Sequence, residues 1–507
     1  MLKHFIPLIA FVCAPFFTGA SAYGQNHPDH PPLVTGPGGQ IGIYGPNGKF
    51  IGIDDDPEAV LGGTLSNPFA SFAPPDVIGF DSTGSIVEYK INKVQGSKWS
   101  ESFLVGMPRG AKLSSPLPVL VLFHSFGRTP QEVLLETDYF SLAMQRGWIV
   151  VAPLGAHEVN YGIDFSQLNV EAALELLVDS IAPSFGASVD LNRFYAVGFS
   201  MGGGAAMSFA ARHLDSSDDG LRFAGVVNHT GSTSLPHVHA YWSANCPGGG
   251  CADTFLELKE WLFGGPPTGK KRLFRYRSAS SIDLDYPLLT IEPNTDMVRN
   301  LVPVPVLHYY CTADLNTDLI TQTKETHSHL LSLGGTSTLI PGNQLPGNGL
   351  HDWQNLPESQ VLDWLAPLSY QAPADSTLVS TLADRDGGWH GFEITQVTQK
   401  VFSPFKWRVS AGGNFIQILY VNNIEEFKIP SPISVGLDPS IDLIVSPHTK
   451  LMSNNMNVVL GEYLSKPSSV TINGNPAVEG TDWSYLAPEV TLVIPGGRNN
   501  SVWKVII

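Results

Sequence analysis

A serine flanked by glycines is the first residue in this sequence whose setting suggests chemistry. Ser200 lies in Gly198-Phe-Ser-Met-Gly202, directly after a buried-strand pattern and directly before a helix pattern rich in Ala and Gly. In so sharp a strand-to-helix turn only glycine is tolerated two positions either side, and the serine hydroxyl projects above the sheet. A chain with 50 glycines can show the bare pattern by chance. A chance match has no reason to lie between these two elements, so we expect Ser200 to be a nucleophile.

A serine hydroxyl needs a histidine to take its proton and a carboxylate to orient that histidine. Asp314 follows a predicted strand that ends at His308, and His351 stands in a Gly-flanked loop before a predicted helix. They complete the order serine, acid, histidine. The competing candidates are Asp318, Asp352, His327 and His329. The last two lie on a predicted helix, where a solvated or packed histidine is the ordinary outcome, so we prefer His351.

An oxyanion formed at Ser200 also needs two backbone N–H donors. We expect one from Met201, at the positive end of the helix that follows the nucleophile. The other is expected from the loop His124-Ser-Phe-Gly127, with Phe126 as the predicted donor. The alternative interpretation of that loop is a plain strand-exit turn.

These residues require a parallel sheet to position them. Continuous apolar runs predict strands at 119–123, 148–152, 193–197, 223–227 and 304–308, and helix patterns lie at 132–145, 170–181, 202–213 and 324–333. Alternation of this kind predicts an α/β fold with a doubly wound, mostly parallel sheet. From Pro373 onward the pattern is short strands between Asn, Gly and Pro, which predicts an all-β, sandwich-like C-terminal domain.

The predicted organisation has four parts. They are a signal peptide at 1–22, a Gly/Pro-rich segment at 23–75, a catalytic domain at 76–368 with an insertion at about 232–300, and a β-rich accessory domain at 369–507. The β-rich part contains Trp389, Trp407, Trp483 and Trp503. Exposed tryptophans would suggest a polymer-binding surface, whereas sandwich cores also use tryptophan, and both interpretations stay open.

Composition narrows the class of partner. The 507 residues are 43% hydrophobic, enough for a large core, and carry a formal charge of −17. That charge repels phosphate backbones and anionic lipid, so we expect no nucleic-acid partner and no membrane-surface partner. An uncharged substrate suits this negative charge better than an anionic one does.

The N-terminus predicts secretion. Lys3 and His4 precede an apolar run from Phe5 to Phe17, and Ala20-Ser-Ala22 supplies the small residues of a cleavage site. The run is shorter than a bilayer span needs, so we expect an extracellular or periplasmic protein without integral membrane association.

The cysteines fit an oxidising compartment. Cys246 and Cys251 flank Pro-Gly-Gly-Gly and are expected to form a local disulfide, because a zinc site would need further ligands at fixed spacing. Cys311 is expected to be a small buried residue. No metal and no cofactor is expected.

The chain resembles the α/β-hydrolase superfamily and, within it, the secreted polyhydroxybutyrate-depolymerase and feruloyl-esterase-like group (carbohydrate esterase family 1-like). The resemblance covers about Ile86 to Leu365 and rests on the following motifs: Phe123-His-Ser-Phe-Gly127, Val150-Val-Ala-Pro153, Asp190-Leu-Asn-Arg193, Gly198-Phe-Ser-Met-Gly-Gly203, Thr312-Ala-Asp314 and the loop with His351 and Trp353. It departs from the family at Ser125, where the family has glycine after the histidine.

Two further features bear on the substrate. The insertion is rich in aromatic residues, which either cover the site as a platform or pack onto the body of the domain. Trp353, beside the expected catalytic histidine, and His229, at a strand end, are candidate substrate-binding residues, although Trp353 equally suits a core.

The resemblance and the residues together predict a secreted serine esterase acting through an acyl-enzyme on a polymeric or bulky ester. Polyhydroxyalkanoate, an aromatic polyester and feruloyl or acetyl polysaccharide all remain possible substrates. The alternatives are a secreted peptidase of the prolyl-oligopeptidase type and a non-catalytic polymer-binding protein.

Overall fold

The structure is a computed structural model. It describes residues 34–35, 41–42, 76–80, 84–110, 116–214, 220–245, 259–314, 316–342, 351–447, 449–452 and 455–507. The expected signal peptide and the expected Cys246–Cys251 disulfide lie outside these residues. None of the helices in this part of the chain combines the length and apolarity that a membrane span requires.

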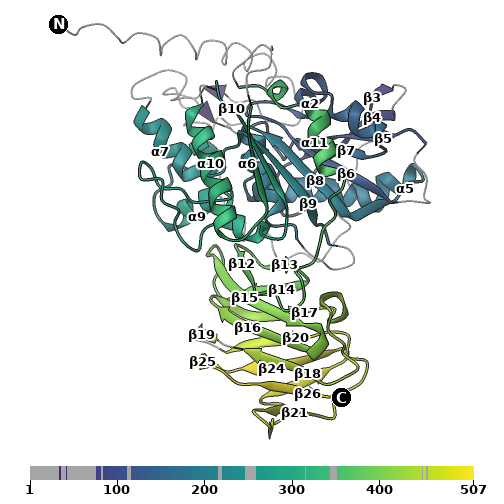
Figure 1. The fold of residues 1–507 in the computed structure, drawn as a ribbon, viewed down its shortest axis with the longest axis vertical. Coiled ribbons are helices and arrows are strands. Elements are labelled where there is room, and N and C mark those ends of the chain that lie inside the picture. Colours follow the sequence, from purple (N-terminus) through teal and green to yellow (C-terminus); the bar gives the residue numbers. More distant parts are fainter. Residues whose placement is uncertain are drawn as a thin grey trace, which may run out of the picture.

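A nine-stranded sheet forms the centre of the α/β unit (Figure 1). Its strands are β3 (Asp76–Phe80), β4 (Gly84–Ile91), β5 (Glu101–Pro108), β6 (Leu117–Phe123), β7 (Ile149–Pro153), β8 (Val189–Phe199), β9 (Phe223–His229), β10 (Val306–Cys311) and β11 (Ser337–Gly342). They lie in the order β11-β10-β9-β8-β6-β7-β5-β4-β3. The six strands from β11 to β7 are parallel, and β5, β4 and β3 continue the sheet antiparallel. The expected α/β fold with a mostly parallel sheet is confirmed.

Helices connect the parallel strands. They are α2 (Pro130–Glu136), α3 (Tyr139–Gln145), α4 (Asp164–Leu176), α5 (Ala182–Ser184), α6 (Met201–Ala210), α7 (Leu235–Asn245), α9 (Lys270–Ser278), α10 (Thr317–Ser332) and α11 (Glu358–Leu365). A π-helical segment, η2 (Leu177–Ile181), continues α4, and η3 (Met297–Leu301) and η4 (Trp353–Asn355) are short 3₁₀ helices. The single helix predicted over 132–145 is two helices, because Thr137 adopts an extended backbone between them.

The C-terminal part consists of two facing β-sheets, as expected. One sheet has the order β12-β15-β16-β18-β26-β21-β22 and the other β13-β14-β17-β20-β24-β23. The bounds are β12 (Val379–Ala383), β13 (Gly387–Trp389), β14 (Phe392–Gln396), β15 (Ser403–Ser410), β16 (Phe415–Val421), β17 (Ile424–Ile429), β18 (Leu443–Pro447), β20 (Met456–Leu460), β21 (Ser469–Ile472), β22 (Asn475–Pro476), β23 (Trp483–Leu486), β24 (Glu489–Ile494) and β26 (Trp503–Ile506). Rings of Phe392 and Trp407, one from each sheet, lie 4.4 Å apart, which closes the core between the sheets.

Two small two-stranded pairs complete the elements. β1 (Val34–Thr35) pairs with β2 (Ile41–Gly42), and β19 (Thr449–Met452) pairs with β25 (Gly497–Asn499).

The tryptophans of the β part are core residues. Trp389 and Trp503 are 1% exposed, and Trp407 and Trp483 are 4% exposed. Of the two interpretations left open by the sequence, the structure therefore supports packing, and these four side chains offer no surface on which a polymer chain could stack.

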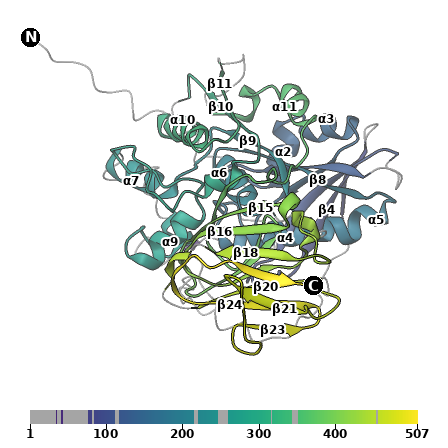
Figure 2. The same cartoon turned by 60° about the horizontal axis from the view of Figure 1, so that its bottom comes forward.

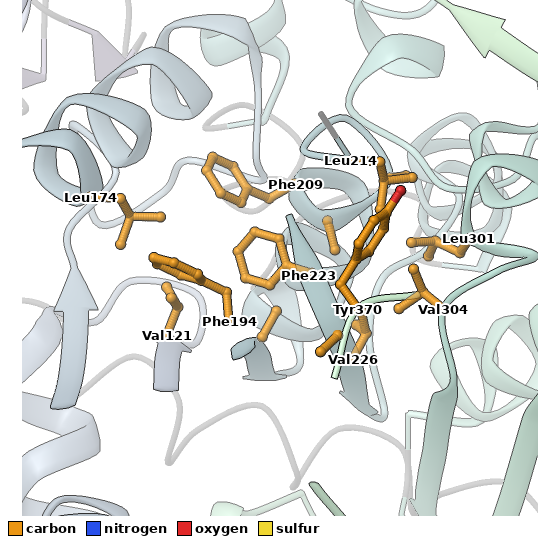
Figure 3. Packing of buried hydrophobic residues seen from close by; sticks show 14 of the residues in the cluster. Val121, Leu174, Phe194, Phe209, Leu214, Phe223, Val226, Leu301, Val304 and Tyr370 are labelled. Atoms are coloured by element: carbon orange, nitrogen blue, oxygen red, sulfur yellow. The ribbon is translucent and has the colours of Figure 1, made fainter. Parts of the chain in front are cut away.

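The β part joins the α/β unit at the end of the parallel strands opposite Ser200. Figures 1 and 2 both show the two sheets of the β part at one end of the molecule, and Figure 1 shows helices α2 and α11 at the other end. The backbone N–H of Tyr370 donates to Asn192 near the start of β8, and that of His390 donates to Leu214, just beyond the last turn of α6. Buried apolar residues of both parts form one continuous cluster, part of which Figure 3 shows around Phe223 and Tyr370.

Candidate active site

Ser200 lies at a strained turn between β8 and α6. Its backbone has φ 58° and ψ −120°, a conformation that a residue other than glycine adopts only when its surroundings enforce it. A Cβ added to Gly198 would lie 2.0 Å from the carbonyl oxygen of Gly202, and one added to Gly202 would lie 2.1 Å from that of Phe123. The two flanking glycines are therefore required by close backbone approach, as the motif predicted.

The backbone of Ser200 is fixed by neighbouring strands and loops. Its N–H donates to the carbonyl of His229 at 3.0 Å, and its carbonyl accepts from the N–H of Ser232 at 3.1 Å. These bonds tie the turn to the end of β9. The side chain is left to face the other polar groups of the site.

His351 bridges Ser200 and Asp314. Its Nε2 lies 2.9 Å from the Ser200 Oγ, and its Nδ1 lies 2.6 Å from the Asp314 Oδ2. The arrangement allows the Nδ1–H to donate to the carboxylate while the hydroxyl donates to Nε2. The structure thus brings together the three residues that the sequence singled out across 151 positions.

The carboxylate of Asp314 is held from a second side. Its Oδ1 accepts the backbone N–H of Asn316 at 2.8 Å, and the side chain is 1% exposed. A buried carboxylate with both oxygens bonded has one orientation, so it fixes the ring plane and the tautomer of His351.

The competing acids and histidines are engaged elsewhere. Asp318 lies 2.9 Å from His237, and Asp352 accepts from the backbone N–H of Gln354. His327 bonds Ser337, and His329 lies 2.9 Å from Asp296. None of these four contacts reaches Ser200.

The Met201 amide has the position expected of an oxyanion donor. Met201 is the first residue of α6, so its N–H lacks a partner within the helix and lies at the positive end of the dipole. In the loop after β6, the Ser125 N–H donates to Glu132 at 2.8 Å and the Gly127 N–H donates to the Glu158 carbonyl at 2.9 Å. The Phe126 amide, predicted as the second donor, lies between these two.

Trp353 and His229 do not face solvent, which corrects the expectation that they contact substrate. Each is 1% exposed. With Phe199 they form an aromatic support behind His351: the Phe199 ring lies 4.5 Å from that of His351, 4.7 Å from His229 and 5.4 Å from Trp353. Sequence reasoning missed Phe199, although its position inside the glycine-serine motif placed it beside the site.

Burial keeps His229 neutral. Burial, with a smaller contribution from His351, lowers the pKa of His229 to about 3. Its Nε2 has no hydrogen-bond partner among the described residues. A neutral, apolar-packed ring suits a support for His351 better than it suits a proton carrier.

The insertion packs onto the body of the α/β unit. Trp261, Phe263 and Tyr276 are at most 6% exposed and share an apolar cluster with Met201 and Tyr161. This favours packing over an exposed aromatic platform for these residues. Phe255, another aromatic residue of the insertion, lies outside the described residues.

A buried lysine strengthens that packing. The Lys259 Nζ donates to the Leu235 carbonyl at 2.7 Å and lies 5.4 and 5.3 Å from the ring centres of Tyr161 and Tyr276. Burial holds the pKa of Lys259 well below its usual range.

In the part of the chain that the structure describes, no group of His, Cys, Asp and Glu is arranged to hold a metal ion, and Cys311 is free and buried.

Comparison with known proteins gives a likeness of fold. No protein-family model and no curated protein matches the sequence. Among solved structures, an S-formylglutathione hydrolase from Agrobacterium tumefaciens is 16% identical, with 59% of this chain and 99% of that chain covered and a TM-score of 0.39. An acetyl xylan esterase from Paenibacillus sp. R4 is 15% identical, with 58% of this chain and 88% of that chain covered and a TM-score of 0.37. A ferulic acid esterase is 16% identical, with 56% of this chain and 97% of that chain covered and a TM-score of 0.36. These neighbours are esterases of the α/β-hydrolase superfamily.

Proposed function

We propose that this protein is a serine carboxylic-ester hydrolase that works through an acyl-enzyme on Ser200. The observation that carries the proposal is the bonded chain from the Ser200 Oγ through both nitrogens of His351 to Asp314, at 2.9 and 2.6 Å. A serine with this pair of partners on a strained strand-to-helix turn is equipped for acyl transfer.

The chemistry follows from the geometry. The Ser200 Oγ attacks the ester carbonyl carbon while His351 Nε2 takes the hydroxyl proton, and Asp314 stabilises the resulting imidazolium. The carbonyl oxygen becomes an oxyanion, which the Met201 and Phe126 amides are proposed to bind. His351 then gives its proton to the departing alkoxide, releasing the alcohol. A water molecule, activated by the same histidine, hydrolyses the acyl-enzyme and restores Ser200.

The proposed substrate is a neutral, bulky or polymeric ester, and the proposed compartment is extracellular or periplasmic. The charge of −17 supports uncharged substrates. The basic residues, apolar run and small residues at 1–22 support secretion.

Product analysis tests the substrate class. Residues 23–507 and a Ser200→Ala control are incubated with polyhydroxybutyrate, an aromatic polyester and feruloylated arabinoxylan, and soluble products are identified by mass spectrometry. Monomer or oligomer released from a polyester only by the intact protein would make it a depolymerase. Ferulate or acetate alone would make it a polysaccharide esterase. Release from none of them would move the substrate to small esters or peptides.

A further inference from the structure

The loop that should supply the second oxyanion donor is held by a buried glutamate from the helix that follows it. Glu132 lies in the first turn of α2, and its side chain is 5% exposed. One carboxylate oxygen accepts the backbone N–H of Ser125 at 2.8 Å. The other accepts the Ser125 hydroxyl in a short hydrogen bond. Both donors of a single residue are therefore engaged by one carboxylate.

This pairing explains the departure from the family pattern at Ser125. Glycine at that position has no hydroxyl, so it could satisfy only one of the two carboxylate oxygens. Glu132 is buried, and its ion-pair partner among the described residues is Arg128, whose Nε lies 4.0 Å away and whose side chain is 50% exposed. A buried carboxylate needs strong donors, and the Ser125 hydroxyl and amide supply them.

The rest of the loop is fixed from other directions. The His124 Nδ1 lies 2.9 Å from the Ser125 carbonyl oxygen, and the Gly127 N–H donates to the Glu158 carbonyl. The Phe126 ring lies 5.8 Å from that of Tyr161. The peptide unit that joins Ser125 to Phe126 is thus oriented by contacts on both sides, and Glu132 supplies the two contacts on the N–H and hydroxyl of Ser125.

We propose that Glu132 is a positioning residue for catalysis: by accepting both donors of Ser125 it sets the orientation of the following Phe126 amide toward the oxyanion. The inference rests on the proposed esterase function. It also excludes the Ser125 amide as an oxyanion donor, because that amide is bonded to Glu132.

Loss of the carboxylate should act on the transition state more than on substrate binding. Without Glu132, the two buried donors of Ser125 are unsatisfied and the loop turns them toward water, which moves the next amide. An oxyanion donor contributes only when it lies close to the position of the developing charge, and losing one costs on the order of 100-fold in kcat. We therefore expect Glu132→Ala to lower kcat about 100-fold with a KM change below about threefold.

Conservative variants separate positioning from bulk stability. In Glu132→Gln the side-chain oxygen can still accept the Ser125 N–H and the amide can donate to the hydroxyl oxygen, so kcat should stay within about tenfold of wild type. Leu135→Ala is the matched control, since Leu135 lies on the same helix and is 81% exposed. It should leave kcat unchanged.

The experiment measures kcat and KM on p-nitrophenyl butyrate and inhibition by a phenylboronic acid, whose tetrahedral adduct on serine mimics the oxyanion. In Glu132→Ala the inhibition constant should rise by the same factor as kcat/KM falls. A folded Glu132→Ala protein whose kcat and boronate affinity match Leu135→Ala would overturn the inference. If Glu132→Ala does not fold, Ser125→Ala, which removes the hydroxyl that Glu132 accepts, replaces it. A folded Ser125→Ala protein with wild-type kcat and boronate affinity would then overturn the inference.

The proposed function is checked separately on the wild-type protein with a fluorophosphonate. Labelling of Ser200 in wild type combined with a normal Glu132→Ala enzyme rejects only the role of Glu132. Absence of wild-type labelling and turnover rejects the esterase function, and the role of Glu132 with it.

Discussion

The catalytic proposal depends on the orientation of one imidazole ring. Asp314 fixes the His351 tautomer through a 2.6 Å contact while its other oxygen is bonded to the Asn316 N–H. An asparagine of the same shape would present to Nδ1 either an NH2 group, which favours the wrong tautomer, or a neutral oxygen, which stabilises the imidazolium less than a carboxylate does. We expect Asp314→Asn to lower kcat by roughly 10³ to 10⁴ with little change in KM. Steady-state kinetics on a soluble ester check this, and a loss below tenfold would contradict the assigned role.

A second prediction at the residue scale concerns a buried histidine that the mechanism does not use. His308 is fully buried, and its Nδ1 accepts from the Asn228 side chain at 3.0 Å. Burial, and to a smaller extent His327, lowers the pKa of His308 from 6.5 to about 3. At pH values between these two pKa values, His308 is protonated in the unfolded chain and neutral in the folded protein, so the unfolded chain binds more protons. Stability from neutral His308 is therefore present above pH 6.5 and is lost as the pH falls toward 3.

The variant His308→Leu removes this titration. Between pH 6 and pH 4 the wild-type free energy of unfolding should fall about 1.4 kcal/mol per pH unit more steeply than that of the variant. Urea unfolding at a series of pH values measures both slopes. The lost Asn228 contact shifts the variant by an amount that does not depend on pH, so equal slopes would show that His308 is not a buried neutral group.

At the scale of elements, the site depends on how closely α6 approaches β6. A Cβ at Gly202 would meet the carbonyl oxygens of Phe123 and His124 at 2.1 and 2.5 Å. These are backbone atoms and cannot rotate away, so the start of α6 must move. We expect Gly202→Ala to lower kcat at least about 100-fold, because Ser200 and the Met201 amide both move.

Gly412→Ala is the control for that substitution, since a Cβ there would meet nothing within 4 Å. Kinetics and circular dichroism of the two variants side by side give the readout. A fully active Gly202→Ala enzyme would mean that the turn has more freedom than the structure shows.

Sequence patterns predicted the elements near the site because local physics sets them. The run at 119–123 and the glycine-serine motif define β6, β8 and the start of α6. Asn473-Gly474, a dipeptide typical of hairpin turns, forms the tight turn between β21 and β22 with φ 51° and 82°. Patterns could not show that Glu132 binds Ser125 or that the tryptophans of the β part are buried. Those features arise from side-chain contacts that form only in the folded chain, which periodicity does not encode.

At the scale of the whole molecule, the β part is joined to the α/β unit by a buried ion pair. The Arg212 guanidinium, 2% exposed, donates to Asp384 at 2.8 and 3.0 Å and to the Ser208 carbonyl at 2.7 Å. Arg212 follows α6, the helix that begins directly after Ser200. The β part therefore supports the far end of α6, at the opposite end of the sheet from the candidate site.

Removing one partner of this pair leaves a buried charge without its counterion. We expect Asp384→Ala to lower the free energy of unfolding by about 3 to 5 kcal/mol. Glu479→Ala, which breaks the exposed pair with Lys466, is the control and should cost less than about 1 kcal/mol. Chemical denaturation measures both. Equal effects would show that the contact between the two parts contributes little to stability.

The central claim is that Ser200 is an activated nucleophile, and covalent labelling tests it most directly. The intact protein is treated with a fluorophosphonate, digested and sequenced by mass spectrometry, beside Ser200→Ala and His351→Ala. We predict one adduct per chain on Ser200, none in Ser200→Ala, and labelling slowed by at least about 100-fold in His351→Ala. Wild-type protein that is folded yet unlabelled, or labelled at another residue, would contradict the account.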